Sequence, residues 1–496
     1  MRVSAKGPLR AGKLFGLCLL AAFVAITLMS ECSFLYPIND WNDAQCFFTV
    51  GRTISSGKVL YRDIYEQKGP LLYFLHACVD WLPFESANPF LEIYILEVLC
   101  AAATLFFLMK TLMLYTGKRR RALACLPLLV VLVYCSSAFV VGDSAEEFAL
   151  PMAAYVLYAT LRMLCGERHE LSRSALFGIG FLCGCVFWIK YTCLFFALGA
   201  MAVPLAVAIR ERNGRLLGRA AAFVTLGVLT ASIPVAVYFG VHKAFDALWE
   251  AYFYNNIFAY SFEGGLLERL RYAVGRTARH ALHNFGFVLF ALGGWIYMLR
   301  QKRTAEAWHL LCIVAAVFLS FLMGGRIYAY SLLPLSVLSV VGAAGLWALL
   351  ACLHPHRQRA ALCTVCLLLC AGLSFPLWGR NFSQKRADVF AYRVVEAIDA
   401  EPGDTLLDVG FLDNGLYTAG NFQPITRYFC RLNVSIPEMK EEWRRVIRNG
   451  EADFVYTGER TLDSFCPPEE QAPYVLLGGE ESNQRLYKLS ENRENR

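Results

Sequence analysis

The stretch ALCTVCLLLCAGLSFPLW at residues 361–378 contains no charged residue. A helix needs about 20 mainly apolar residues to cross the hydrocarbon core of a bilayer, and this stretch comes close to that length. Residues 14–29, LFGLCLLAAFVAITLM, form a second uncharged run of the same kind. Runs of this type follow one another along the chain, which predicts a polytopic helical membrane protein.

The composition agrees with this prediction. The 496 residues are 57% hydrophobic and 18% charged, whereas soluble domains carry about 25% charged residues. A cleaved signal peptide is the alternative for the first run, but no small-residue cleavage site follows it. The net charge of +7 does not indicate a nucleic-acid partner, because it comes largely from short loops between the apolar runs.

We expect about eleven spanning helices, at residues 14–35, 89–115, 122–141, 147–165, 174–189, 192–209, 216–240, 281–299, 307–323, 328–352 and 359–377. If these spans alternate in direction, all the basic clusters fall on one side: residues 2–13, 118–121, 168–173, 210–219, 300–303 and 357–359. Short loops rich in Lys and Arg stay in the cytoplasm. The N-terminus is therefore expected in the cytoplasm and the C-terminal region outside it, in a multi-pass protein of the cell membrane.

Two long stretches between spans, 36–88 and 241–280, are expected on the outer side. Within them, WNDAQCFFTVGRTISSG (41–57) and FDALWEAYFYNNIFAYSF (245–262) read as amphipathic helices lying on the membrane surface. The apolar run 71–83 is too short to span and is expected to be a re-entrant or interfacial helix.

The composition changes near residue 379. DTLLDVG (404–410) and ADFVYTG (452–458) predict short strands, while YRVVEAIDAEPG (392–403) and PEMKEEWRRVIRNG (437–450) predict amphipathic helices that stop at Gly. Alternating helices and strands indicate a small α/β domain. The expected organisation is an all-α membrane domain at 1–378 and an extracytoplasmic α/β domain at 379–496.

Ionisable residues gather on the expected outer side. A carboxylate there is able to take a proton from an attacking hydroxyl, and a nearby Lys or Arg is able to neutralise a leaving phosphate. Both charges suit a sugar donor whose polyprenyl tail lies in the bilayer. The residues concerned are expected to converge on one cleft that faces away from the cytoplasm: Asp40, Asp43, Glu66, Lys68, Glu146, Glu147, Lys190 and Arg326, with Tyr328 and Tyr330 beside them.

Several short motifs in a fixed order resemble the outer loops of one enzyme family. They are WNDAQCFFTVGRTISSGKVLYRDIYEQKGPLLYFL (41–75), GDSAEEFALP (142–151), FWIKYT (187–192) and GGRIYAYSLLPL (324–335). The chain resembles the GT-C superfamily of integral membrane glycosyltransferases. More narrowly, it resembles the bacterial branch related to protein O-mannosyltransferases and to the aminoarabinose transferase of lipid A. The mannosyltransferases have an Asp-Glu pair where this chain has Asp43 followed by Ala44. A strict assignment as a protein O-mannosyltransferase is therefore disfavoured.

The resemblance implies a role for each motif residue. Asp43 would be the catalytic carboxylate, with Asp40 as the second choice. Lys68 would contact the carrier phosphate, and Glu66 would be a metal or structural partner. The remaining roles are a second carboxylate or acceptor contact for Glu146 and Glu147, phosphate contacts for Lys190 and Arg326, and the lining of the cavity for Tyr328 and Tyr330.

Simpler roles exist for most of these residues. Asp43 would cap a helix that starts near Ala44, Glu66 and Lys68 would form a surface ion pair of little energetic value, and Lys190 would extend to the interface. Arg326 would only set topology, and the two tyrosines would belong to an aromatic belt. Glu146 and Glu147 are equally good candidates at their position.

Cysteine and histidine leave two further questions open. Cys430 and Cys466 in the C-terminal region are able to pair, but connectivity is not readable from sequence. His76 and His283 are isolated, so they predict no metal site, and a divalent metal is only an open option.

The sequence therefore predicts an inverting transfer of a sugar from a polyprenyl-phosphate donor to an envelope glycan, lipid or protein. A transporter or flippase of a lipid-linked or anionic substrate is the alternative, and it predicts charges near the middle of the bilayer. A non-catalytic membrane scaffold is the third reading, and it predicts no dependence on Asp43 or Lys190.

Overall fold

The computed structural model describes residues 8–490 except 80–87, 118, 167–168, 260–263, 325, 352, 374–381, 399, 402, 435 and 479–483. The chain divides into two compact units. Unit 1 contains residues 1–33, 94–235 and 262–381, and unit 2 contains residues 34–93, 236–261 and 382–496. These units do not follow the expected boundary at 378/379, because segments 34–93 and 236–261 belong with the C-terminal region. The two-domain division itself stays a prediction.

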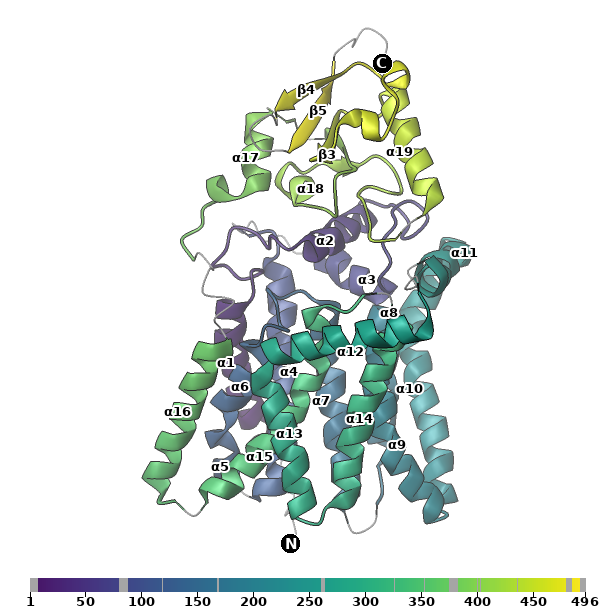
Figure 1. The fold of residues 1–496 in the computed structure, drawn as a ribbon. Coiled ribbons are helices and arrows are strands. Elements are labelled where there is room, and N and C mark those ends of the chain that lie inside the picture. Colours follow the sequence, from purple (N-terminus) through teal and green to yellow (C-terminus); the bar gives the residue numbers. More distant parts are fainter. Residues whose placement is uncertain are drawn as a thin grey trace. The chain divides into compact units, whose positions relative to one another are not determined.

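Unit 1 is a bundle of apolar helices (Figure 1). Two short 3-10 segments, η1 (Tyr191–Cys193) and η3 (Ala329–Leu338), lie within it. The helices are α1 (Pro8–Met29), α4 (Leu91–Thr116), α5 (Arg119–Ala124), α6 (Leu126–Tyr134), α7 (Ala145–Leu164), α8 (Arg173–Lys190), α9 (Leu194–Arg210), α10 (Gly214–Val241), α12 (Leu266–His283), α13 (Phe285–Arg300), α14 (Thr304–Met323), α15 (Ser339–Leu350) and α16 (Pro355–Leu373).

Helical structure lies at each position where a span is expected, and the differences are in length. The first helix ends at Met29 rather than at residue 35, and the span expected at 122–141 is divided into α5 and α6. Residues 374–377 and 80–83 of two expected helices lie outside the described residues. By length and composition, six described helical stretches are able to cross a membrane, or seven if one bent pair counts as a span, which is fewer than the roughly eleven spans expected. The chain is a multi-pass membrane protein.

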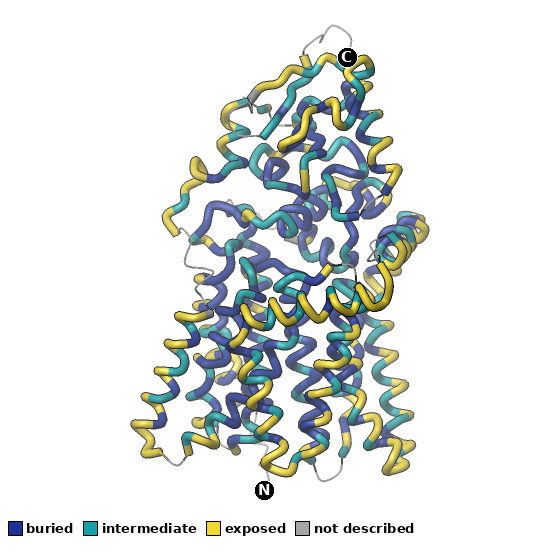
Figure 2. Tube along the Cα trace, in the orientation of Figure 1, coloured by how far each residue is buried: buried dark blue, intermediate teal, exposed yellow. Residues whose placement is uncertain are grey.

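The bent pair consists of α12 and α13, whose axes meet at 99°. Helix α12 is amphipathic and mostly exposed (Figure 2), including Leu266 at 80% and Leu282 at 75% exposure. A helix with apolar residues on one side and arginines on the other suits the plane of a membrane interface. All but the last three residues of this helix fall in the stretch 241–280 that the sequence predicts to lie outside the spans, and residues 281–283 fall in the span expected at 281–299.

Unit 2 combines two helices of the first long loop with a C-terminal α/β region. The loop helices are α2 (Asn42–Ser55) and α3 (Pro70–Val79), and α11 (Phe245–Leu248) continues into the π-helical segment η2 (Trp249–Ala259). The C-terminal helices are α17 (Phe390–Ala397), α18 (Leu416–Ala419) and α19 (Pro437–Asn449), with three short 3-10 turns at 386–388, 462–464 and 468–470.

The C-terminal region has a five-stranded mixed sheet in the order β2-β1-β3-β5-β4. Its strands are β1 (Thr405–Asp408), β2 (Gln423–Pro424), β3 (Phe454–Gly458), β4 (Tyr474–Gly478) and β5 (Arg485–Leu489). The pairs β2-β1 and β1-β3 are parallel, and β5 is antiparallel to both β3 and β4. Both expected strands and both expected helices of this region are confirmed, and α19 stops at Gly450 with a φ of 62°, as a left-handed C-cap requires.

Helix α2 forms where the sequence predicts it, but protein covers its apolar face. Nine of its residues are buried. The helix packs on α3. Gln45 Oε1 accepts a hydrogen bond of 2.6 Å from the Thr418 hydroxyl, and the Thr49 hydroxyl donates one of 2.6 Å to Asp413 Oδ2, with Thr418 and Asp413 both in the C-terminal region. An amphipathic pattern indicates that one face of a helix is buried, but it does not indicate whether lipid or protein covers that face. For this reason the sequence pattern predicted that the apolar face of α2 lies on a membrane surface.

Candidate active site

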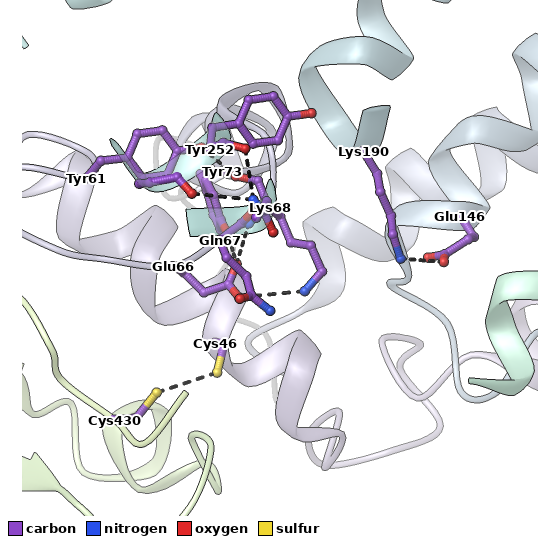
Figure 3. A network of polar contacts seen from close by, with 12 residues as sticks. Cys46, Tyr61, Glu66, Gln67, Lys68, Tyr73, Glu146, Lys190, Tyr252 and Cys430 are labelled. Carbon is purple, nitrogen blue, oxygen red and sulfur yellow. Dashed lines mark hydrogen bonds and ion pairs between the residues drawn. The ribbon is translucent and has the colours of Figure 1, made fainter. Parts of the chain in front are cut away.

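The loop before α3 holds a buried cluster around Lys68 (Figure 3). Glu66 Oε2 accepts hydrogen bonds from the Lys68 backbone N–H at 2.9 Å and from the Tyr73 hydroxyl. Lys68 Nζ lies 3.6 Å from Glu66 Oε1 and 5.4 Å from the centre of the Phe47 ring. We call Phe47, Glu66, Lys68 and Tyr73 the Lys68 cluster. Because the Glu66 side chain is only 4% exposed, this is not the surface ion pair of the simpler reading.

Neighbouring side chains hold this loop in place. The Tyr65 hydroxyl accepts a hydrogen bond from Asn255 Nδ2 at 3.0 Å, and the Gln67 carbonyl accepts one from Asn256 Nδ2 at 2.7 Å. Pro70 then starts α3 at the position where its missing N–H costs nothing. The polar run before Gly69-Pro70 is thus fixed between a helix start and the π-helical segment η2.

Asp43 lies in the first turn of α2 and is partly buried. The N-cap residue of α2 is Trp41, so Asp43 does not have the helix-capping role that the simpler interpretation gives it. Residues i and i+4 of a helix share a face, so Asp43 lies on the face of α2 that carries Phe47, the ring against which Lys68 lies. Burial raises the pKa of the Cys46 thiol, and the negative charges of Asp413, Glu66 and Asp43 raise it further. Unit 2 thus brings Asp43, Glu66 and Lys68 into one neighbourhood.

A second cluster in unit 1 surrounds Lys190 (Figure 3). Lys190 Nζ at the end of α8 lies 2.6 Å from Glu146 Oε1 at the start of α7. The same ammonium lies 5.3 Å from the centre of the Tyr330 ring, and Tyr330 stacks on Tyr328 with 5.2 Å between ring centres. We call Glu146, Lys190, Tyr328 and Tyr330 the Lys190 cluster. Lys190 is therefore paired within the protein rather than only extended to an interface.

Glu147 has a different environment from Glu146. Its Oε2 accepts a hydrogen bond of 3.0 Å from the Asp143 backbone N–H, which also donates to Glu97 Oε1 at 2.7 Å. Glu97 Oε2 in turn accepts from the Ser30 hydroxyl at 2.7 Å. Sequence reasoning missed Glu97, although an acidic residue inside an apolar span is itself a signal of a buried partner or a function.

The other candidate residues are placed more simply. Asp40 and Arg326 have exposed side chains. His76 is buried, and its Nδ1 lies 2.9 Å from the Leu72 carbonyl oxygen within α3. Within the described ranges, no group of three or more His, Cys, Asp or Glu side chains is arranged to hold a metal ion. Whether the two clusters serve one cleft stays a prediction.

The fold is the one that the motif resemblance implies, because it matches solved structures of ArnT over nearly the whole chain. Two solved structures share it: ArnT from Cupriavidus metallidurans bound to undecaprenyl phosphate, and the same protein in the apo state. The first has a TM-score of 0.60 over 97% of this chain and 98% of its own, and the second has 0.65 over 96% and 97%. The identity is 11% in both cases. No protein-family model and no curated protein matches the sequence.

Proposed function

We propose that this chain is an integral membrane glycosyltransferase that uses a polyprenyl-phosphate-linked sugar as donor. The observation that carries the proposal is the match of nearly the whole chain to the fold of ArnT, including a structure of ArnT with bound undecaprenyl phosphate. In unit 2, the Asp43 carboxylate lies on the face of α2 that carries Phe47, and the ammonium of Lys68, from the loop before α3, lies 5.4 Å from the centre of the Phe47 ring. These two groups carry the charges that such a transfer needs. The acceptor is an envelope glycan, lipid or protein, and the reaction takes place at the outer face of the membrane.

The proposed reaction is a single displacement with inversion at the anomeric carbon. The acceptor hydroxyl oxygen forms the new bond to this carbon while the bond from the carbon to the phosphate oxygen breaks. Asp43 takes the hydroxyl proton as general base, and polyprenyl phosphate leaves with the bonding electrons. Lys68 stabilises the negative charge that develops on this phosphate.

The other residues receive supporting roles. Glu66 is a structural partner, because its carboxylate joins the Lys68 backbone and the Tyr73 hydroxyl. Lys190 and Arg326 are further phosphate contacts, and Tyr328 and Tyr330 line the cavity, as the family resemblance implies. Glu146 sets the position of Lys190, and Glu147 is the weaker candidate for an acceptor contact. The proposal uses no metal ion.

The test uses the purified full-length chain in lipid nanodiscs with a panel of undecaprenyl-phosphate-linked sugars and an envelope extract as acceptor. Mass spectrometry measures the release of undecaprenyl phosphate. The change Asp43→Asn should lower this release by about 10²–10⁴-fold, the usual contribution of a general base. Binding of undecaprenyl phosphate should be unchanged, because Asn keeps the size of the side chain.

Asp40→Asn is the matched control, because Asp40 is a nearby carboxylate with an exposed side chain. This variant should release undecaprenyl phosphate at the wild-type rate. Full activity of Asp43→Asn would remove Asp43 from the mechanism. Movement of intact donor across a vesicle membrane, without release of undecaprenyl phosphate, would identify a flippase instead.

A further inference from the structure

Two cysteines that are far apart in sequence meet inside unit 2. Cys46 Sγ and Cys430 Sγ lie 3.9 Å apart, although 384 positions separate them along the chain. Both side chains are buried, at 1% and 0% exposure. Figure 3 shows the two sulfur atoms facing each other. The sequence offered Cys466 as the partner of Cys430, whereas the sulfur that lies beside Cys430 is that of Cys46.

Hydrogen bonds that do not involve the cysteines hold both of them in place. On the α2 side, Gln45 and Thr49 bond to Thr418 and Asp413. On the other side, the Phe429 carbonyl accepts from the Asp408 backbone N–H at 3.1 Å, and the Arg431 backbone N–H donates to the Phe411 carbonyl at 2.9 Å. The meeting of the two sulfurs is therefore a consequence of how α2 docks on the C-terminal region.

We propose that Cys46 and Cys430 form a disulfide that links α2 to the C-terminal α/β region. The sulfurs need to approach from 3.9 Å to about 2.05 Å, which small side-chain rotations accomplish. The expected extracytoplasmic position of unit 2 supplies the compartment in which disulfides form and persist. The proposal does not depend on the transferase activity.

The oxidant is the disulfide of an extracytoplasmic thiol–disulfide oxidoreductase. One cysteine thiolate attacks this disulfide and forms a mixed disulfide, and the second thiolate then displaces the oxidoreductase sulfur. The two cysteines lose two electrons and two protons, and the oxidoreductase becomes a dithiol. Burial raises the pKa of both thiols, so the exchange takes place before α2 is fully docked.

The link has a consequence for the proposed base. Asp43 lies three residues before Cys46, which places the two on adjacent turns of the same side of α2. A covalent bond at Cys46 would hold the first turn of α2, and with it Asp43, against the C-terminal region. Cys46 is thus a positioning residue for Asp43, and it closes a loop long enough to restrict the unfolded chain strongly.

The experiment starts with cells that express the full-length chain and are treated with an alkylating reagent before lysis. Mass spectrometry of a non-reducing digest should find a peptide that joins Cys46 to Cys430 and disappears after reduction. The peptide should be absent from Cys46→Ser and Cys430→Ser. It should persist in Cys466→Ser, the matched control, since Cys466 is a buried cysteine of the same α/β region.

A second measurement uses only protein that has folded. Reductant should lower the unfolding temperature of the wild-type protein and leave that of Cys46→Ser/Cys430→Ser unchanged. Alkylation of both cysteines in denatured, unreduced wild-type protein, with no linked peptide, would overturn the proposal. That result would leave the proposed transferase activity untouched, because the release assay with Asp43→Asn tests it separately.

Discussion

The Lys68 cluster and the Lys190 cluster use the same residue types in different ways. In each, a lysine ammonium lies over an aromatic ring and beside a glutamate. The Lys190 pair is direct, at 2.6 Å, whereas the Lys68 pair is at 3.6 Å and its glutamate also binds a backbone N–H and a tyrosine hydroxyl. Glu146 thus mainly compensates the charge of Lys190, while Glu66 mainly shapes a loop. Removal of Lys68 should therefore mainly lower the rate of sugar transfer, whereas removal of Lys190 should mainly lower the stability of the protein.

Within this comparison of the two clusters, the largest expected effect is that of Lys68→Met on sugar transfer. If Lys68 stabilises the leaving phosphate, its loss should lower turnover by about 10²–10³-fold, as for other groups that stabilise charge in a transition state. The rate of undecaprenyl phosphate release at saturating donor measures this. The unfolding temperature should change little, because the Glu66 carboxylate keeps its bonds to the Lys68 backbone and to Tyr73.

Lys68→Arg is the control for this change, because it keeps the positive charge. Part of the activity should return, and the affinity for undecaprenyl phosphate should return more fully than the rate. Equal activity of Lys68→Met and wild type would remove the difference in chemical role between the two clusters.

The second effect concerns the support of α2, which carries Asp43 and Phe47. Asp413 accepts the Thr49 hydroxyl hydrogen bond at 2.6 Å. Burial raises the pKa of Asp413 from its ordinary value of 3.8 to about 6. Between these two values the folded protein binds more protons than the unfolded protein, so stability falls as pH rises through this window. The loss amounts to about 3 kcal/mol, at 1.36 kcal/mol per unit.

Unfolding of the purified protein measured between pH 4 and pH 7 tests this expectation. The variant Asp413→Asn should show a smaller decrease in stability with rising pH. The stability of this variant should still fall somewhat with rising pH, because burial also raises the pKa of Asp408. An unchanged slope in Asp413→Asn would show that this carboxyl group does not couple pH to the docking of α2.

Sequence patterns predicted most of the elements because they are local properties of the chain. The lengths of the apolar runs predicted helices at positions where the structure has them. Glycines predicted the ends of α19 and β3. What covers an apolar face, and which distant residues meet, are not local properties. The pattern of α2 could not reveal that Thr418 and Asp413 cover it, and the meeting of Cys46 with Cys430 requires a fold that brings positions 384 apart together.

The same limit applies to the candidate site residues. Motif order indicated Lys190, Glu146, Tyr328 and Tyr330, and the structure brings these four together. Sequence gave no reason to prefer Glu146 over Glu147, because adjacent residues on a helix point in different directions. Only the positions of α8 and α4 decide that Glu146 meets Lys190 and that Glu147 shares the Asp143 N–H with Glu97.

The third effect tests the stability role of the Lys190 pair. Glu146 is 3% exposed, so Lys190→Met would leave a buried carboxylate without its charge partner. Such a loss costs 3–5 kcal/mol for a fully buried pair, and about 2 kcal/mol is expected here, because the Lys190 side chain is 22% exposed and water screens it. The measurement is the unfolding free energy of the purified protein in detergent.

The double variant Lys190→Met/Glu146→Gln should recover most of this stability, because it removes the charge that the single variant leaves behind. Sugar transfer should not recover with stability, because the double variant still lacks the ammonium that is proposed to contact the donor phosphate. A double variant less stable than Lys190→Met would contradict the view that charge compensation is the main role of Glu146.

The smallest effect concerns the turn that precedes Glu146. Gly142 has a φ of 90°, and a Cβ there would lie within 3 Å of Glu97 Oε1 and Ser30 Oγ. Gly117 in the same unit also has a positive φ, of 65°, but no atom within 4 Å of a Cβ. Alanine at either position costs about 1 kcal/mol for the backbone conformation. Gly142→Ala should cost about 1 kcal/mol more, because the carboxylate of Glu97 has to move. Unfolding measurements on the two variants give this difference, and equal losses would show that the Glu97 site tolerates displacement and does not fix the turn that carries Glu146.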